Sequence, residues 1–262
     1  MPEESTKGAD PEQSPPMPED AARARAPRHE FAVPPNKIDI VKDHDQAFQG
    51  FNEAMRGLDL GLNARRAFSD TLALEGVDRL APDPRAPHDP DKASRYGVTP
   101  AALADAQRSD PSLRAVGRPA DLTPEQAARV YRSHLDTSLK GVSSASPGRP
   151  SGSELLQEIE DPKTAGFLFD TLFRHGAPAR ANIVRDAVSD TLKGIPAAER
   201  AALDSESLGR RGVMDVGTFD AFATLANGEH ADRLREHLKA RRDDAKPADG
   251  DKARTSYYAA LD

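Results

Sequence analysis

The 262-residue sequence predicts a mostly α-helical protein. Apolar residues recur three and four positions apart along several segments, which is typical of one face of a helix. No segment keeps a sustained alternation of apolar and polar residues, so we expect little strand. Two of the periodic segments begin with Thr-Pro, and threonine suits the N-cap of a helix while proline suits its first turn. We therefore expect two helical regions behind an N-terminal tail.

The tail comprises residues 1–37, which we expect to be disordered. Eight of the 22 prolines precede Asn36, and this segment has no apolar run. The rest of the chain is long enough for one or two domains. The net charge of -7 predicts no general attraction to nucleic acid. The sequence has no cysteine, so no disulfide supports the fold.

The first helical domain is expected over residues 38–142. Apolar periodicity and the two Thr-Pro starts predict helices at residues 45–58, 63–75, 99–108 and 123–138. The start at Thr123 also has the spacing of a capping box. Four prolines in residues 76–98 predict a long loop, with a turn near residues 95–97.

A second helical region is expected over residues 154–262. Before it, residues 142–153 are rich in Ser, Gly and Pro and are the best candidate for a linker. The helices expected in this region are residues 164–173, 179–192, 197–203, 216–226, 229–241 and 252–261.

Glu75 is the most informative polar residue. It continues a helical face on which positions 64, 67, 68, 71 and 72 are Ala, Ala, Phe, Thr and Leu. Burial against apolar neighbours disfavours the charged form of a carboxyl, and a carboxyl that stays protonated can act as a general acid. The alternative is a glutamate that reaches into solvent from a helix end, and periodicity alone favours that alternative.

The residues after Glu75 resemble a known family. Glu75-Gly76 is followed by Asp83-Pro84, by residues 89–100 (DPDKASRYGVTP) and by residues 121–132 (DLTPEQAARVYR). Their order and spacing resemble glycoside hydrolase family 108, the lysozyme-like N-acetylmuramidases that cleave peptidoglycan. In that family a helix ends in Glu-Gly-Gly, and a loop carries Asn-Asp-Pro and then Asp-Pro-Gly-Gly-x-Thr-Asn-Tyr-Gly-Ile-Thr. A Leu-Thr-x-Glu-x-Ala-x-x-x-Tyr-Arg segment comes next.

The second half resembles the helical peptidoglycan-binding region that follows these muramidase domains. The matching segments are residues 168–176 (LFDTLFRHG), 211–218 (RGVMDVGT) and 254–261 (RTSYYAAL). Together the two resemblances cover roughly residues 60–262 and imply a lysozyme-like domain followed by a helical wall-binding region.

The resemblance implies two catalytic carboxylates. Glu75 is the candidate proton donor to the leaving oxygen of the glycosidic bond. Asp89 falls on the family's Asp-Pro aspartate and is the preferred second carboxylate, with Asp83 and Asp91 as other choices. The alternative for each aspartate is a turn residue without a catalytic role.

Two further loop residues are candidates for substrate binding. Ser94 occupies the family's Thr position, where its hydroxyl would position water or else satisfy the loop backbone. Tyr96 would stack on a sugar ring or else pack the loop onto the core. His134 lies on an apolar helix face and is expected to be a core histidine rather than a catalyst.

Several residues depart from the family pattern. Val77 replaces the second glycine of Glu-Gly-Gly, and Asp91 and Lys92 replace the Gly-Gly of the loop. Arg95 replaces the Asn before Tyr-Gly, and Arg174 replaces an asparagine in the second half. Because glycines in tight loops let a ligand approach closely, we expect a reshaped cleft. Two functions stay open: a peptidoglycan hydrolase, or a catalytically weakened or inactive wall-binding or secretion-associated protein.

No cofactor or metal is expected. Residues 43–45 (DHD) and the pair His230 and His237 lack a convincing metal spacing. The expected partners are peptidoglycan glycan strands, and neither a membrane-spanning segment nor a signal peptide is recognised. We therefore expect synthesis in the cytoplasm and, after export through a holin or a specialised secretion system, action in the periplasm or cell wall.

Overall fold

The computed structural model describes residues 45–75, 92–145, 147–202 and 208–245 of the chain. Contacts divide the chain into residues 1–30 and residues 31–262, and every described residue belongs to the second unit. The described residues are mostly helical, which confirms the predicted class. An antiparallel bridge joins Arg95 to Val98. The predicted tail and the helix expected at residues 252–261 lie outside the described residues.

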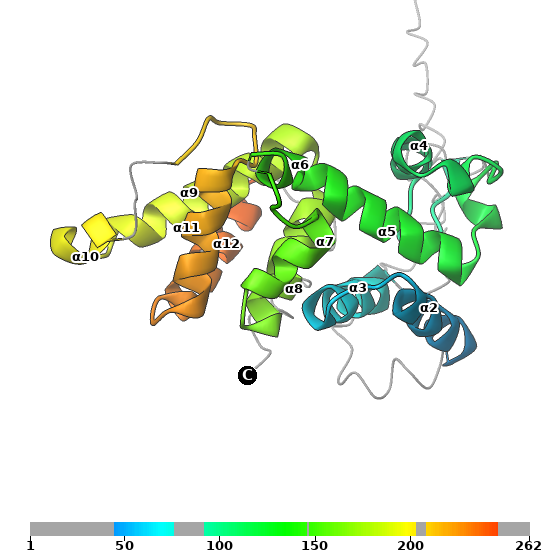
Figure 1. Cartoon of the computed structure of the whole chain (residues 1–262), viewed down its shortest axis with the longest axis horizontal. Coiled ribbons are helices and arrows are strands. Elements are labelled where there is room, and N and C mark those ends of the chain that lie inside the picture. The colour runs from blue at the N-terminus through cyan, green and yellow to red at the C-terminus, as the bar shows by residue number, and fades with distance from the viewer. Residues whose placement is uncertain (1–44, 76–91, 146, 203–207, 246–262) are drawn as a thin grey trace, which may run out of the picture. The chain divides into compact units, whose positions relative to one another are not determined.

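The helices begin and end close to the residues expected from apolar periodicity (Figure 1). Those of the first half are α2 (Asp45–Gly57), α3 (Leu62–Glu75), α4 (Pro100–Ser109), α5 (Pro124–Ser138) and α6 (Lys140–Ser143), with 3-10 turns η2 (Pro111–Leu113) and η3 (Pro119–Asp121). Those of the second half are α7 (Gly152–Leu155), α8 (Pro162–Arg174), α9 (Ala177–Lys193), α10 (Ala197–Ala202), α11 (Val216–Asn227) and α12 (Ala231–Asp244), with the 3-10 turn η4 (Leu156–Glu158).

Both Thr-Pro pairs start helices as predicted. The Thr99 side chain accepts a hydrogen bond from the backbone N–H of Ala102 at 3.2 Å. At α5, the Gln126 N–H donates to the Thr123 hydroxyl at 3.2 Å and the Thr123 N–H donates to the Gln126 side chain at 2.9 Å. These bonds satisfy backbone donors that a helix start leaves without a partner, so they fix where α4 and α5 begin.

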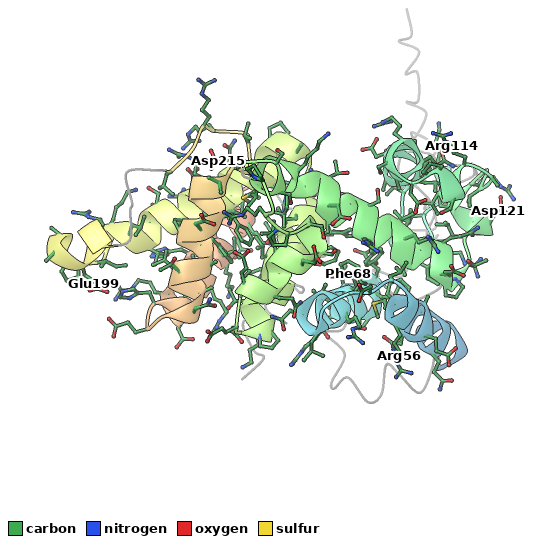
Figure 2. All side chains as sticks on the ribbon, viewed as in Figure 1. Arg56, Phe68, Arg114, Asp121, Glu199 and Asp215 are labelled. Atoms are coloured by element: carbon green, nitrogen blue, oxygen red, sulfur yellow. The ribbon has the colours of Figure 1, made fainter. Side chains whose placement is uncertain are left out.

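The core joins helices from both halves of the chain. Phe68 of α3 is fully buried, with its ring centroid 5.6 Å from that of Tyr131 in α5 and 4.7 Å from that of Phe169 in α8. Figure 2 shows Phe68 between these helices, whereas Arg56 points outward from α2. The packing of α3 on α8 is the most extensive between any two described helices. The C-terminal ends of the two helices lie next to each other.

The predicted linker packs against α5 near its end. Ser153 is buried, and its backbone N–H donates to the Asp136 carboxylate at 3.0 Å. A division into separate domains at residues 142–153 stays a prediction. None of the helices in the described part of the chain is long and apolar enough to cross a membrane.

Candidate functional site

Glu75 is the last residue of α3, as predicted, and its side chain is only 15% exposed. The apolar stripe before it is confirmed, since Ala64, Ala67, Phe68 and Leu72 are fully buried. One carboxylate oxygen, Oε1, lies 3.4 Å from Nη1 of Arg174, the last residue of α8. The carboxyl is therefore held at the junction of two helix ends and is not a solvated surface group.

The predicted turn at residues 95–97 is present. The Arg95 N–H donates to the Val98 carbonyl at 3.2 Å, and the Val98 N–H donates to the Arg95 carbonyl at 2.8 Å. The two central residues, Tyr96 and Gly97, have φ values of 54° and 70°. Positive φ at both central positions is the signature of a type I′ turn, and it is unusual for tyrosine.

This turn packs directly on the Glu75 side chain. A Cβ atom at Gly97 would lie 2.4 Å from Cγ of Glu75 and 2.9 Å from its Cδ. Gly97 is thus required twice, by its backbone angle and by the proximity of Glu75. The end of α3 and the turn are separated in the sequence by residues 76–94, and the fold brings them into contact.

Tyr96 fits the second of its two predicted roles, packing the loop onto the core. Its side chain is only 2% exposed, and its backbone carbonyl accepts a hydrogen bond from the Tyr131 hydroxyl at 2.8 Å. The guanidinium of Arg95 lies 5.1 Å from its ring centroid and donates to the carbonyl of Ala120 at 2.8 Å. A ring so enclosed offers no free face on which a sugar could stack.

The other predicted residues are placed less fully. Ser94 is partly buried immediately before the turn. Asp83, Asp89 and Asp91 lie outside the described residues, so the pairing of Glu75 with a second carboxylate stays a prediction. Sequence reasoning missed the contact between Arg174 and Glu75, which are separated by 99 positions. The only available signal was that Arg174 departs from the family's asparagine.

The Gly97→Ala variant is expected to lose more stability than a glycine replacement with the same backbone strain. Gly148 is the matched control, since its φ is 81° and nothing lies within 4 Å of its Cβ position. Left-handed φ alone costs alanine about 1–2 kcal/mol. The clash with Glu75 is expected to add about 1–3 kcal/mol, as overpacking does. Urea unfolding of both variants measures the difference, and equal losses would contradict the close packing of the turn on Glu75.

His134 is a core histidine, as expected. Its Nε2 lies 2.9 Å from the Leu172 carbonyl oxygen and 3.2 Å from Nη1 of Arg180. Burial lowers the pKa of His134, and the nearby Arg180 guanidinium lowers it further, against the opposing effect of the Leu172 hydrogen bond. The ring packs edge-on against Phe173, with centroids 5.3 Å apart.

This lowered pKa predicts that the fold loses stability on acidification. Between the folded pKa and the unfolded value near 6.5, the unfolded chain binds more protons, so stability rises with pH in that window. The slope for one proton reaches at most about 1.4 kcal/mol per pH unit. Urea unfolding from pH 7 to pH 5 should therefore show a steeper loss for the wild type than for His134→Gln. Parallel losses in the two proteins would contradict this assignment.

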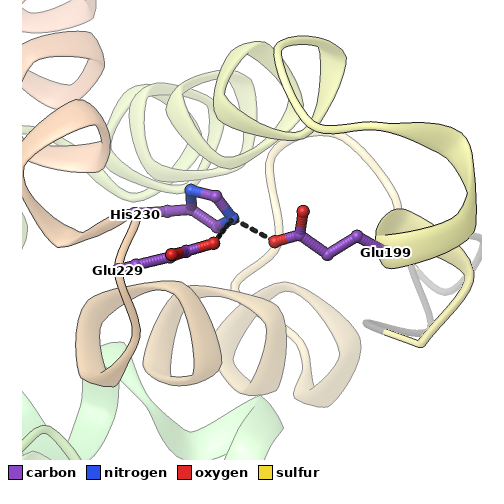
Figure 3. A group of neighbouring side chains, drawn as sticks. All are labelled: Glu199, Glu229 and His230. Carbon is purple, nitrogen blue, oxygen red and sulfur yellow. Dashed lines mark hydrogen bonds and ion pairs between the residues drawn. The ribbon is translucent and has the colours of Figure 1, made fainter.

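A possible cation site lies in the second half. Glu199, Glu229 and His230 bring three ligand-type atoms within 4.8 Å of one another (Figure 3). His230 Nε2 and Glu199 Oε1 are 2.5 Å apart, which is a hydrogen bond joining α10 to the start of α12. Glu229 is 79% exposed. The hydrogen bond accounts for the cluster as a structural contact, and spacing alone could not pair His230 with a residue 31 positions away.

Comparisons of this chain with models of protein families, with curated proteins and with solved structures found no match. The site must accordingly be interpreted from its own residues and from the motifs in the sequence.

Proposed function

We propose that this chain is a peptidoglycan hydrolase, an N-acetylmuramidase similar to glycoside hydrolase family 108, with Glu75 as its general acid. The contact between Glu75 and Gly97 carries the proposal. The resemblance rests on separate motifs, of which one ends in Glu75-Gly76 and another contains Tyr96-Gly97. Their packing on one another supports the idea that they belong to one site.

The position of Glu75 suits a proton donor. A catalytic group works best on a rigid element, and Glu75 ends a helix that is anchored by the buried apolar stripe on the same face. In the proposed reaction the Glu75 carboxyl protonates the leaving glycosidic oxygen. Asp89 would assist by activating water or by stabilising the oxocarbenium-like transition state. Ser94 is proposed to position the attacking water.

Arg174 favours a second candidate, a weakened or inactive hydrolase that binds the cell wall or acts with a secretion system. The carboxylate oxygen Oε1 of the proposed acid is engaged by a cation, whereas a general acid must reach the leaving oxygen with that same carboxyl. Nη1 of Arg174 lies 3.4 Å from the proposed acid. The family has an uncharged asparagine at this position, so the replacement by Arg174 places a positive charge beside the Glu75 carboxyl.

The Arg174→Asn variant is expected to clear purified sacculi faster than the wild type, because it removes the cation from the Glu75 carboxyl and restores the uncharged residue of the family pattern. Turbidity measures the clearing, and Arg174→Lys serves as the control that keeps a cation. If wild type and Arg174→Asn both sediment with sacculi and release no reducing ends, the wall-binding candidate replaces the hydrolase.

Under either candidate the partner is the peptidoglycan glycan strand. A holin or a specialised secretion system is the proposed route by which the protein reaches the periplasm or cell wall.

A further inference from the structure

A cavity lies beside α5, and Glu75 is not among the residues that line it. It encloses about 530 Å³, which is within the range of small-molecule sites. Its walls come from the end of α4, from η2, from Leu58 after α2 and from one stripe of α5. We call this cavity the α5 groove.

The α5 groove faces away from the Glu75 site. The α5 residues that line it occupy positions 129, 132, 133, 136 and 137, and Lys140 at the start of α6 lies beyond them. At 3.6 residues per turn these positions form one stripe roughly opposite Tyr131, whose side chain points to the turn beside Glu75. From position 129 to position 137 the stripe covers eight helical steps, or about 12 Å at 1.5 Å per residue. A groove of this length suits an extended ligand.

The polar lining of the α5 groove is fixed by the fold. The hydroxyls of Ser109 and Ser133 lie 2.6 Å apart. Arg132 donates to the Leu58 carbonyl at 2.7 Å, which ties the end of α2 to α5. Asp136 accepts from the Ser153 N–H at 3.0 Å, and burial raises its pKa against the opposing effects of that hydrogen bond and of Arg132. Ordered hydroxyls and a carboxyl are groups that can pair with the hydroxyls of a sugar.

The lining of the groove carries both positive and negative side chains. Arg129 is paired with Glu125 at 3.0 Å and lies 3.9 Å from Asp110. Among the described residues, the exposed ammonium of Lys140 makes no ion pair. The two aspartates would repel a ligand with a charge on every unit, such as a nucleic acid. A ligand with occasional carboxylates and many hydroxyls matches both features.

We propose that the α5 groove binds a short acidic glycan, a sugar chain in which some rings carry a carboxylate. The sugar hydroxyls pair with Ser109, Ser133 and Asp136, and a carboxylate pairs with Lys140. A peptide-free peptidoglycan strand, whose muramic acid carries a carboxylate, is one source of this chemistry, and a uronic-acid chain is another. Binding here does not require cleavage at Glu75.

The test is calorimetric titration of the full chain carrying Glu75→Gln, so that no ligand is consumed. The ligands are a peptide-free tetrasaccharide of N-acetylglucosamine and N-acetylmuramic acid, an oligogalacturonate, and the neutral chitin tetrasaccharide. Lys140→Gln should weaken binding of an acidic ligand about tenfold, since a hydrogen bond to a charged group contributes about 1.5 kcal/mol or more. Arg114→Gln, at an exposed cation outside the groove, should leave binding unchanged.

Each outcome decides one point. Binding of either acidic glycan with the expected loss in Lys140→Gln supports the groove, and the preferred glycan identifies the source. Three results would overturn the proposed glycan site. They are no binding of either acidic glycan, equal binding of the neutral chitin tetrasaccharide, or an unchanged affinity in Lys140→Gln. If the groove fails while the wild type still releases reducing ends from sacculi, the hydrolase proposal stands alone.

Discussion

The Glu75→Gln variant is expected to clear sacculi at least about a hundredfold more slowly than the wild type, because general acid catalysis contributes about 10²–10⁴-fold to rate. Glutamine has nearly the shape of glutamate, and its amide oxygen can still accept from Arg174. It has no acidic proton to transfer to a leaving oxygen. The melting temperature should change little, since the packing of the side chain against Gly97 is retained.

Glu53→Gln is the matched control for this experiment. Glu53 is an exposed glutamate of α2, so the same chemical change there should leave clearing and folding unaffected. Clearing by Glu75→Gln at the wild-type rate would remove Glu75 from the mechanism, and a cooperative unfolding transition in the same sample would show that the variant is folded.

Breaking the buried pair between Asp170 and Arg242 is expected to cost about 3–5 kcal/mol. Both side chains are 0% exposed, and Arg242 Nη1 lies 2.9 Å from Asp170 Oδ2. The guanidinium also lies 5.2 Å from the ring centroid of Phe167. Asp170→Ala would leave this cation buried between α8 and α12 without its carboxylate. Urea unfolding measures the loss.

Replacing both partners tests whether the loss comes from the uncompensated charge. The double variant Asp170→Ala and Arg242→Met should be more stable than Asp170→Ala alone, since it leaves no unpaired buried charge. Asp105→Ala, which removes an exposed ion pair with Arg108, should change stability little. If the double variant is no more stable than the single variant, packing rather than charge accounts for the loss.

Local sequence signals predicted most of the helices. The caps at Thr99 and Thr123 depend on residues only three positions away, and the end of α3 at Glu75 follows from an apolar stripe and the next glycine. The turn at Tyr96 was also predicted from its local sequence. Such features are set by neighbouring residues, so no knowledge of the tertiary fold was needed.

The long-range contacts could not be predicted in this way. Arg174 reaches Glu75 across 99 positions, and Arg242 reaches Asp170 across 72. Periodicity identifies which face of a helix is buried but not which charged residue of another helix meets it. The hydrogen bond from Tyr131 to the Tyr96 carbonyl spans 35 positions, and local sequence around Tyr96 left both of its predicted roles open.

Incubation of the full wild-type chain with purified sacculi, followed by mass spectrometry of the soluble products, tests the proposed cleavage of the glycan strand. The account predicts soluble fragments whose new reducing ends are N-acetylmuramic acid. Fragments released only by peptide-bond cleavage, new reducing ends only on N-acetylglucosamine, or no soluble glycan at all would contradict it.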